Sequence, residues 1–290
     1  MHFDYGLKLN DRNDLILSHP ITQHYPLLIT SPHSGRIYSE QFLQMTRLPL
    51  SQLRQSEDSF VEILYEQAPL HGATLLQTQI PRIYCDLNRE AWEIDPILIY
   101  DKIPAWCNTQ SDRVKRGYGT LCRIANNGKA IYRNRLSFSE AEKRISDCWF
   151  PFHNTVKEWI NQQIYHFKGC IILDVHSMSM PKIRTFYNAD IVLGDAFGQT
   201  CSPKLVQTSE AFFQSKGLTV ARNMPYAGGY ITRYYGNPKA NIHAMQIEIN
   251  KQLYMDEKDF KCNSDFHQLQ SVLSDYIKII ADLLQKEILR

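Results

Sequence analysis

Two segments of the chain end an apolar run with residues that bind metals or move protons. The run CIILDVHSM contains Asp174 and His176, and the segment SPHSG places His33 between a proline and a glycine. Because side chains alternate along a strand, Asp174 and His176 lie on one face. An imidazole beside a carboxylate is typical of a metal-bound histidine, whose other ring N–H is held by an acidic group. A turn-forming Asp–Ser pair, or a surface-loop histidine at His33, is the alternative.

A serine hydrolase explains the same run less well. Ser177 directly follows His176, so the two side chains point to opposite faces of a strand. The chain also lacks the GxSxG sequence of a nucleophile elbow.

A carboxylate interrupts another apolar strand. In AMQIEIN, the residues Gln246, Glu248 and Asn250 share one side of the strand, and apolar residues occupy the other. A buried carboxylate is costly unless it is paired, bound or reactive, and burial tunes its pKa toward that of a general base. The alternative is that this polar side faces solvent.

The segment YCDLNR adds Asp86, Asn88 and Arg89 near the end of a third apolar run. A guanidinium suits bidentate binding of a carboxylate, although a salt bridge at a sheet terminus fits as well. Ligands of open α/β sheets collect beyond the strand ends. Two histidines, a glutamate and an arginine there favour a hydrolytic zinc centre with three protein ligands and a water.

Alternating short apolar runs and helical patterns predict an α/β fold that positions these residues. The predicted strands are Pro26–Ser34, Ala73–Ile80, Ile83–Leu87, Cys170–Ser177, Ala189–Asp195, Leu218–Tyr226 and Ala244–Asn250. The predicted helices are 57–72, 137–167 (with a capping box at Ser139 and Glu142 and a kink or break at Pro151), 202–217 and 265–289. The polar stretch from Asp95 to Lys129 has no clear period and reads as an excursion over the sheet edge that covers a site.

The totals predict one soluble domain over residues 1–290. Lys plus Arg number 32 against 30 for Asp plus Glu, which gives no attraction for nucleic acid or an anionic membrane. Seven dispersed cysteines without a CxxC pair argue against a disulfide framework and favour a reducing, cytoplasmic location. No signal-peptide pattern opens the chain, and no apolar run approaches the roughly 18 residues that span a bilayer. The sequence specifies no oligomeric state.

These residues lie in segments that resemble the N-formylglutamate amidohydrolase (N-formylglutamate deformylase) family. The matching segments run in the family's order from about Ser31 to Glu257: SPHSG, EDSFVEILYE, RIYCDLNR, AEKRISDCWFPFHNTV, ILDVHSM, DIVLGDAFG, NMPYAGGYITRYYG and IHAMQIEINKQLYMDE. The resemblance implies a mixed central sheet flanked by helices on both faces, of the zinc-exopeptidase-like (phosphorylase/hydrolase-like) kind.

The resemblance further implies one Zn²⁺ per chain, held by His33, Asp58 and His176. Asp58 is expected in the first turn of the helix that begins near Glu57, and Glu57 and Glu62 are the competing carboxylates. The HxxE spacing of zinc carboxypeptidases is absent, because HSGR places Arg36 at the glutamate position.

The remaining roles follow from the same resemblance. Glu248 is expected to move the proton of the attacking water, and Arg89 to hold a substrate carboxylate or the oxyanion. Asp174 and Asp86 are expected to support the metal ligands. The expected substrate contacts are Asn88, Arg82, Arg123, Arg184, Asn223, Tyr230 and Arg233.

The implied activity is zinc-dependent removal of formyl from N-formyl-L-glutamate, a small-molecule reaction of histidine degradation. One alternative is a carboxypeptidase- or aspartoacylase-like deacylase with another N-acyl amino acid substrate. The other is a ligand-binding relative without catalysis, although such a protein has no need of His33, His176 and Glu248 together.

Overall fold

A mixed β-sheet forms the centre of the computed structural model, which describes residues 6–8, 14–21, 24–179 and 189–288. Eight strands pair in the order β1-β2-β4-β3-β5-β8-β6-β7, and β9 and β10 form a separate ribbon. The strands are β1 Gly6–Lys8, β2 Leu15–Ser18, β3 Leu27–Ser31, β4 Thr74–Thr78, β5 Cys170–Met178, β6 Ile191–Gly194, β7 Val220–Arg222, β8 Ile242–Asn250, β9 Met255–Asp256 and β10 Lys261–Cys262.

The central strands are parallel, so their carboxyl ends meet at one edge. β3 pairs in parallel with β4 and β5, and β5 pairs in parallel with β8. The register places His176 opposite Glu248. β6 runs antiparallel to β8, and β2 antiparallel to β4. The polar carboxyl ends predicted for β5 and β8 therefore lie side by side, because His176 and Glu248 are paired.

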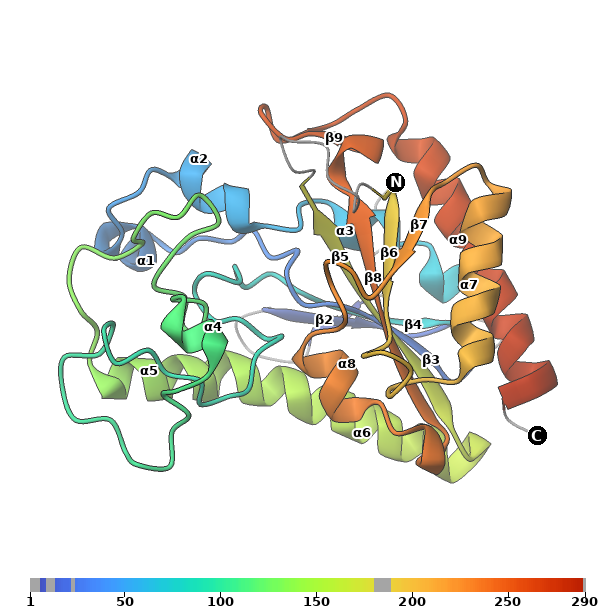
Figure 1. The fold of residues 1–290 in the computed structure, drawn as a ribbon, viewed down its shortest axis with the longest axis horizontal. Helices are drawn as coiled ribbons and strands as arrows, with labels where there is room; N and C mark the ends of the chain where they lie inside the picture. The colour runs from blue at the N-terminus through green and yellow to red at the C-terminus, as the bar shows by residue number, and fades with distance from the viewer. Residues whose placement is uncertain (1–5, 9–13, 22–23, 180–188, 289–290) are drawn as a thin grey trace.

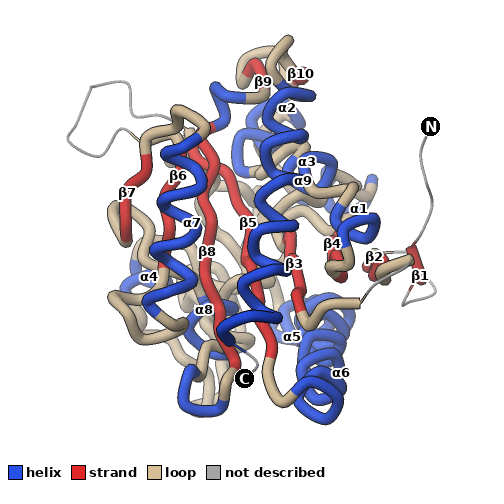
Figure 2. Tube along the Cα trace, turned by 90° about the vertical axis from the view of Figure 1, so that its right-hand side faces the viewer, coloured by secondary structure: helices blue, strands red, loops and turns tan. Residues whose placement is uncertain are grey.

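Helices cover both faces of the sheet (Figures 1 and 2). One face carries α3 Val61–Leu64, α7 Pro203–Ser215 and α9 Phe266–Leu283, and the other carries α5 Phe138–Arg144, α6 Phe150–Phe167 and α8 Tyr230–Tyr235. The short helices α1 Glu40–Met45, α2 Leu50–Leu53 and α4 Asp112–Lys115 lie beside the sheet edge in Figure 1. The predicted mixed sheet with helices on both faces is confirmed.

The strand face toward α6 changes character along its length. Near their amino ends, β5 and β8 place Cys170, Ile172 and Ala244 in the core beneath α6. The same face continues with Asp174, His176 and Glu248 at the carboxyl ends, because these residues have the same parity. On the opposite parity, Ile171, Leu173 and Val175 of β5 and Met245, Ile247 and Ile249 of β8 belong to the apolar core that includes α7 and α9. The α6 face therefore holds a hydrophobic core at one end and a polar site at the other.

The predicted strand Ile83–Leu87 is wrong. The chain turns there, since Tyr84 N–H and Cys85 N–H both donate to the carbonyl of Pro81. Asp86 N–H donates to the carbonyl of Thr120 in the excursion rather than to a strand. The apolar residues of this segment face the core without joining the sheet.

The predicted helix over 57–72 is also wrong as a continuous element. Phe60 has the left-handed φ of 68° directly before α3, so Asp58 lies in a loop and not in a first helical turn. After α3, Pro69 stands in a separate 3₁₀ turn, Ala68–His71. Tyr65 N–H closes the last turn of α3, and the helix does not continue.

The long helix through Pro151 is continuous, and Ser137 caps it instead of Ser139. The Ser137 side chain accepts from Glu140 N–H. A π-helical turn, Ile145–Trp149, joins α5 to α6 directly before Pro151. Proline clashes with the carbonyl four residues earlier, which here belongs to Asp147 in the widened turn. The π turn therefore accommodates the proline without a break.

The excursion 95–129 contains the short helix α4, turns and isolated β-bridges, in agreement with its lack of a clear period. Below it, the fully buried guanidinium of Arg144 lies among the rings of Phe42, Tyr84 and Tyr132, with its carbon 4.2 Å from the Tyr84 centroid. It donates to Glu140 and to the Tyr132 hydroxyl. Arg144 on α5 thus contacts Phe42 of α1 as well as Tyr84 and Tyr132, which lie in the segments before and after the excursion.

All seven cysteines are free, which agrees with the predicted lack of a disulfide framework. Among the described residues, no helix has the length and apolar character to cross a lipid bilayer.

Close packing behind His33 yields a stability prediction. A Cβ on Gly35 would lie 2.1 Å from the carbonyl oxygen of Ile80, so the loop after β3 and the end of β4 would have to separate. We expect Gly35→Ala to lower the free energy of unfolding by about 2 kcal/mol or more, measured by urea denaturation.

Gly128→Ala is the matched control. Gly128 has a φ of 77° and no neighbour within 4 Å of an added Cβ, so only backbone strain of about 1 kcal/mol applies. Equal losses in the two variants would contradict the importance of this contact.

Candidate metal centre and active site

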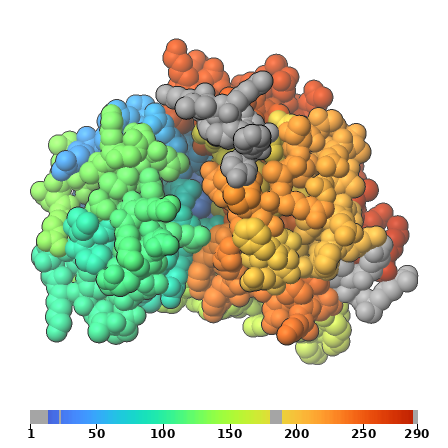
Figure 3. Space-filling model, viewed as in Figure 1, coloured from blue at the N-terminus to red at the C-terminus, as the bar shows by residue number. Residues whose placement is uncertain are grey.

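The site lies at the carboxyl ends of the parallel strands, in a cavity of about 1090 Å³. Its walls come from the strand ends, from the excursion and from residues 225–229 and 255–260. Figure 3 shows the hollow between the green excursion and the orange C-terminal segments. Ligands of open α/β sheets bind at such an edge.

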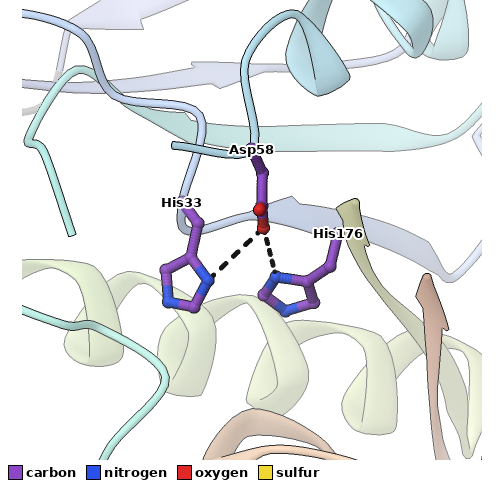
Figure 4. A group of neighbouring side chains, drawn as sticks. All are labelled: His33, Asp58 and His176. Carbon is purple, nitrogen blue, oxygen red and sulfur yellow. Dashed lines mark hydrogen bonds and ion pairs between the residues drawn. The ribbon is translucent and has the colours of Figure 1, made fainter. Parts of the chain in front are cut away.

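Three buried side chains converge in this cavity (Figure 4). His33 follows β3, Asp58 precedes α3, and His176 stands near the end of β5. Asp58 Oδ2 lies 2.9 Å from His176 Nδ1 and 3.5 Å from His33 Nδ1. One ligand atom of each residue lies within 4.8 Å of the others, which suits a single metal ion.

Two further aspartates determine which ring nitrogens face the centre. His33 Nε2 lies 2.7 Å from Asp86 Oδ1, and His176 Nε2 lies 3.0 Å from Asp174 Oδ2. Each aspartate accepts a hydrogen bond from its histidine, so both Nε2 atoms carry protons. Both Nδ1 atoms then direct a lone pair toward Asp58.

This arrangement fits a cation. Two imidazole lone pairs and a carboxylate oxygen face one another, and they repel unless a proton or a metal ion lies between them. Within the described part of the chain, His33 Nδ1 has no hydrogen-bond partner although it is buried. Two histidines and a carboxylate, each histidine supported by an acidic group, are a ligand set typical of catalytic zinc.

The electrostatics of the three residues agree with this. Burial alone would raise the pKa of Asp58, but its interactions with His176 and His33 outweigh burial and hold the pKa below its usual range. Burial would lower the pKa of His176, yet Asp174 and Asp58 raise it well above the usual value. Surroundings that stabilise an imidazolium also stabilise a bound cation.

Glu57 and Glu62, the competing carboxylates, have other partners. Glu57 accepts hydrogen bonds from Tyr38, Arg54 and Ser59. Glu62 pairs with Arg36 at 2.5 Å. Among the described acidic side chains, Asp58 alone joins the two histidines in a metal-sized group.

Glu248 lines the same cavity on the strand next to His176. Its Oε1 accepts a hydrogen bond from Gln246 Nε2 at 2.6 Å. Burial raises the pKa of Glu248 to about 7, against the opposing attraction of His176. A carboxylate with such a pKa both accepts and returns a proton near neutral pH.

Comparison with known proteins identifies the group of proteins to which this chain is related. A family model described as N-formylglutamate amidohydrolase matches residues 25–255. The chain belongs to the N-formylglutamate amidohydrolase family.

Individual relatives of the chain carry names from the same family. The N-formylglutamate deformylase of Pseudomonas aeruginosa is 27% identical over 238 residues, which cover 80% of this chain and 83% of the relative. That of Pseudomonas putida is 25% identical over 254 residues, covering 86% and 89%. The crystal structure of N-formylglutamate amidohydrolase from Ralstonia eutropha JMP134 superposes with a TM-score of 0.89 at 33% identity, covering 94% of this chain and 99% of that one.

Asn88 links Asp174, the aspartate that supports His176, to the start of α8 in the cavity wall. Its Nδ2 donates to Asp174 Oδ2, and its Oδ1 accepts from Ile231 N–H at the start of α8. The Ile231 bond fixes the amide orientation, so the short Nδ2 contact with His176 Nε2 joins two donors that share Asp174. A Cβ on Gly229 would lie 2.4 Å from Asn88 Nδ2, which explains the glycine.

Three of the predicted arginines line the cavity of this amidohydrolase-family chain: Arg82, Arg89 and Arg233. Arg82 Nη2 lies 2.8 Å from Asp86 Oδ2, on the side of Asp86 away from His33. The pKa of Asp86 is accordingly well below its usual range, because Arg82 and His33 outweigh the effect of its burial.

Other predicted substrate contacts lie elsewhere. Arg123 pairs with Asp95, and Asn223 binds the Asp195 side chain and backbone. Tyr230 packs against Trp149 and Tyr234. None of these three lines the cavity formed by the described residues. Arg184 lies outside the described residues.

Several residues that line the cavity were not predicted from the sequence, among them Arg113, Arg116, Tyr226 and Lys251. Arg113 and Arg116 stand three residues apart on α4 or its C-cap, after the capping serine Ser111. The sequence did contain a signal for Arg113 and Arg116, because a capping serine followed by basic residues at helical spacing indicates a short helix with one basic face.

The geometry predicts metal binding by purified protein. We expect about one zinc per chain by elemental analysis. His176→Ala removes a ligand and should abolish this content, whereas His166→Ala, at an exposed position on α6, should retain it. Full metal content in His176→Ala would contradict the assignment.

The supporting aspartates give a second prediction. Asp86→Asn leaves the three ligands in place but removes the charge that holds His33 Nε2–H. We expect zinc affinity to fall about 10- to 100-fold, measured by competition with a chelator. Unchanged zinc affinity would show that Asp86 binds Arg82 without supporting the metal ligand His33.

Proposed function

We propose that this chain is a zinc-dependent amidohydrolase that removes formyl from N-formyl-L-glutamate or a closely related N-acyl amino acid. The products would be formate and L-glutamate, in histidine degradation in the cytoplasm. One observation carries the proposal: His33, Asp58 and His176 converge beside a buried glutamate in a cavity rich in arginine. The deformylase names of the Pseudomonas relatives support the same activity.

The metal would be held by His33 Nδ1, Asp58 Oδ2 and His176 Nδ1. A zinc ion bound there supplies Lewis acidity, which lowers the pKa of a bound water toward about 7 and polarises the amide carbonyl. Three protein ligands leave a position for that water.

Glu248 acts as the proton carrier in this proposal. It accepts a proton from the attacking water and then gives it to the nitrogen of the departing amino acid. A pKa of about 7, raised by burial, suits both transfers, since the group must be a base first and an acid second. Gln246 holds Glu248 Oε1 and leaves Oε2 for the reaction.

The cavity arginines bind the negatively charged groups of the substrate in this proposal. Arg82 Nη2 lies 2.8 Å from Asp86 Oδ2, and Asp86 in turn holds His33, so we place Arg82 beside the reacting amide. Arg89 lies beside it, with Nη2 3.9 Å from Asp86 Oδ2. We assign Arg82 to the α-carboxylate and the developing oxyanion, and Arg89 to a substrate carboxylate, with Asn88 holding the wall in place.

The proton-transfer role predicts the behaviour of Glu248→Gln. This variant keeps the size of the side chain and all metal ligands, so its zinc content should match the parent protein. Its kcat should fall about 10²- to 10⁴-fold, because the base is lost. Parental kcat with normal zinc content would refute the role.

The substrate is tested with a panel of N-formyl, N-acetyl and N-succinyl amino acids. We expect the highest kcat/KM for N-formyl-L-glutamate. Preference for a larger acyl group would favour the aspartoacylase- or carboxypeptidase-like deacylase. Binding without turnover of any member would favour the non-catalytic relative.

A further inference from the structure

The cavity wall carries a marked excess of positive charge. Seven cationic side chains line it, against three carboxylates, of which Asp58 belongs to the metal group. Such an excess favours an anionic ligand with more than one negative charge.

The cations nearest the strand ends already have partners. Arg82 pairs with Asp86, and the buried Lys251 donates to the carbonyl of Glu57 at 2.6 Å. These contacts fix the inner end of the cavity and leave the outer cations to be explained.

Arg113 on α4 is different. It is half-buried and lines the cavity, yet within the described chain no hydrogen bond or ion pair involves its guanidinium. Burial lowers the pKa of Arg113, and the charges of Arg89 and Arg233 lower it further, while Glu93 and Asp86 act in the opposite direction. Arg113 therefore lines the same cavity as two other arginines, Arg89 and Arg233.

Those two groups are held from behind. Arg89 donates through Nε to the carbonyl of Tyr118 and through Nη1 to that of Asn88. Arg233 donates through Nε to the carbonyl of Gly228. These bonds fix the side chains and leave Nη2 of Arg89 and both Nη atoms of Arg233 for a ligand.

The three arginines come from separate elements. Arg113 lies on α4 in the excursion, Arg233 on α8, and Arg89 on the turn that follows Asp86 (Figure 1). Like charges gathered from three segments repel one another, and a bound carboxylate relieves this repulsion through charge-assisted hydrogen bonds.

We infer that Arg89, Arg113 and Arg233 form a subsite for the side-chain carboxylate of the substrate, with Arg113 as its specificity-determining residue. The inference rests on the proposed function and deepens it. Arg82 pairs with Asp86, which holds the candidate metal ligand His33, whereas Arg113 lies on α4 in the wall of the same cavity. The α-carboxylate, which is close to the scissile amide, belongs near Arg82, and the more distant carboxylate of glutamate reaches Arg113.

The test compares a charged substrate with its neutral isostere. For the parent protein, Arg113→Gln, Arg113→Lys and Lys115→Gln, kcat/KM is measured on N-formyl-L-glutamate and N-formyl-L-glutamine. Lys115 lies on the same helix, is exposed and does not line the cavity, so Lys115→Gln makes the same charge change away from the subsite.

We expect Arg113→Gln to lower the glutamate-to-glutamine ratio of kcat/KM roughly 10- to 100-fold, mainly through KM. Arg113→Lys keeps the charge but loses the bidentate geometry and should give an intermediate ratio. Lys115→Gln should keep the parental ratio. A parental ratio in both Arg113 variants, or equal losses on both substrates, would overturn the subsite.

A binding measurement separates this outcome from failure of the proposed function. The dissociation constants of L-glutamate and L-glutamine are measured by calorimetry on the same zinc-loaded proteins. If the parent protein hydrolyses no N-formyl amino acid, the proposed function fails, but selective binding of glutamate that is lost in Arg113→Gln still supports the subsite. Equal affinity of parent and variant for glutamate overturns it.

Discussion

The mutual orientation of two imidazoles around one carboxylate governs the site. His33 and His176 both present Nδ1 to Asp58 Oδ2, and each does so because an aspartate accepts from its Nε2. If either supporting aspartate were neutral, the ring could turn or carry its proton on the other nitrogen. The pKa of Asp86 lies well below its usual range, because Arg82 and His33 outweigh its burial, and this keeps the charge behind His33 in place. A cavity that is positive overall thus encloses a negative centre at its base.

The sheet supplies this geometry at little cost to the core. Along β5 and β8, one parity is mainly apolar, and the other changes from apolar to polar toward the carboxyl ends of the strands. The register then places His176 beside Glu248 without any loop. A candidate metal ligand and the proposed base therefore lie opposite each other on paired strands of the central sheet, which suits a reaction that depends on precise positioning.

The strand-borne half of the site was predictable from sequence, because period-2 alternation places Asp174, His176 and Glu248 whatever the surrounding loops do. Asp58 was not, since it lies in a loop whose conformation depends on the left-handed Phe60, and only the family resemblance indicated it. Arg113 was missed because the excursion has no apolar period. The strand predicted at Ile83–Leu87 failed because apolar residues can bury themselves in turns when another segment accepts their backbone hydrogen bonds.

The excursion is held by its own turns and by Leu98, Ile99 and Leu121, which join the core on the α6 face of the sheet. The proposed reaction and the proposed selectivity nevertheless belong to different segments, because His176 and Glu248 lie on β5 and β8 and Arg113 lies on α4. Under the two proposals, a substitution in α4 changes which amino acid is accepted and leaves the strands that carry the chemistry unaltered.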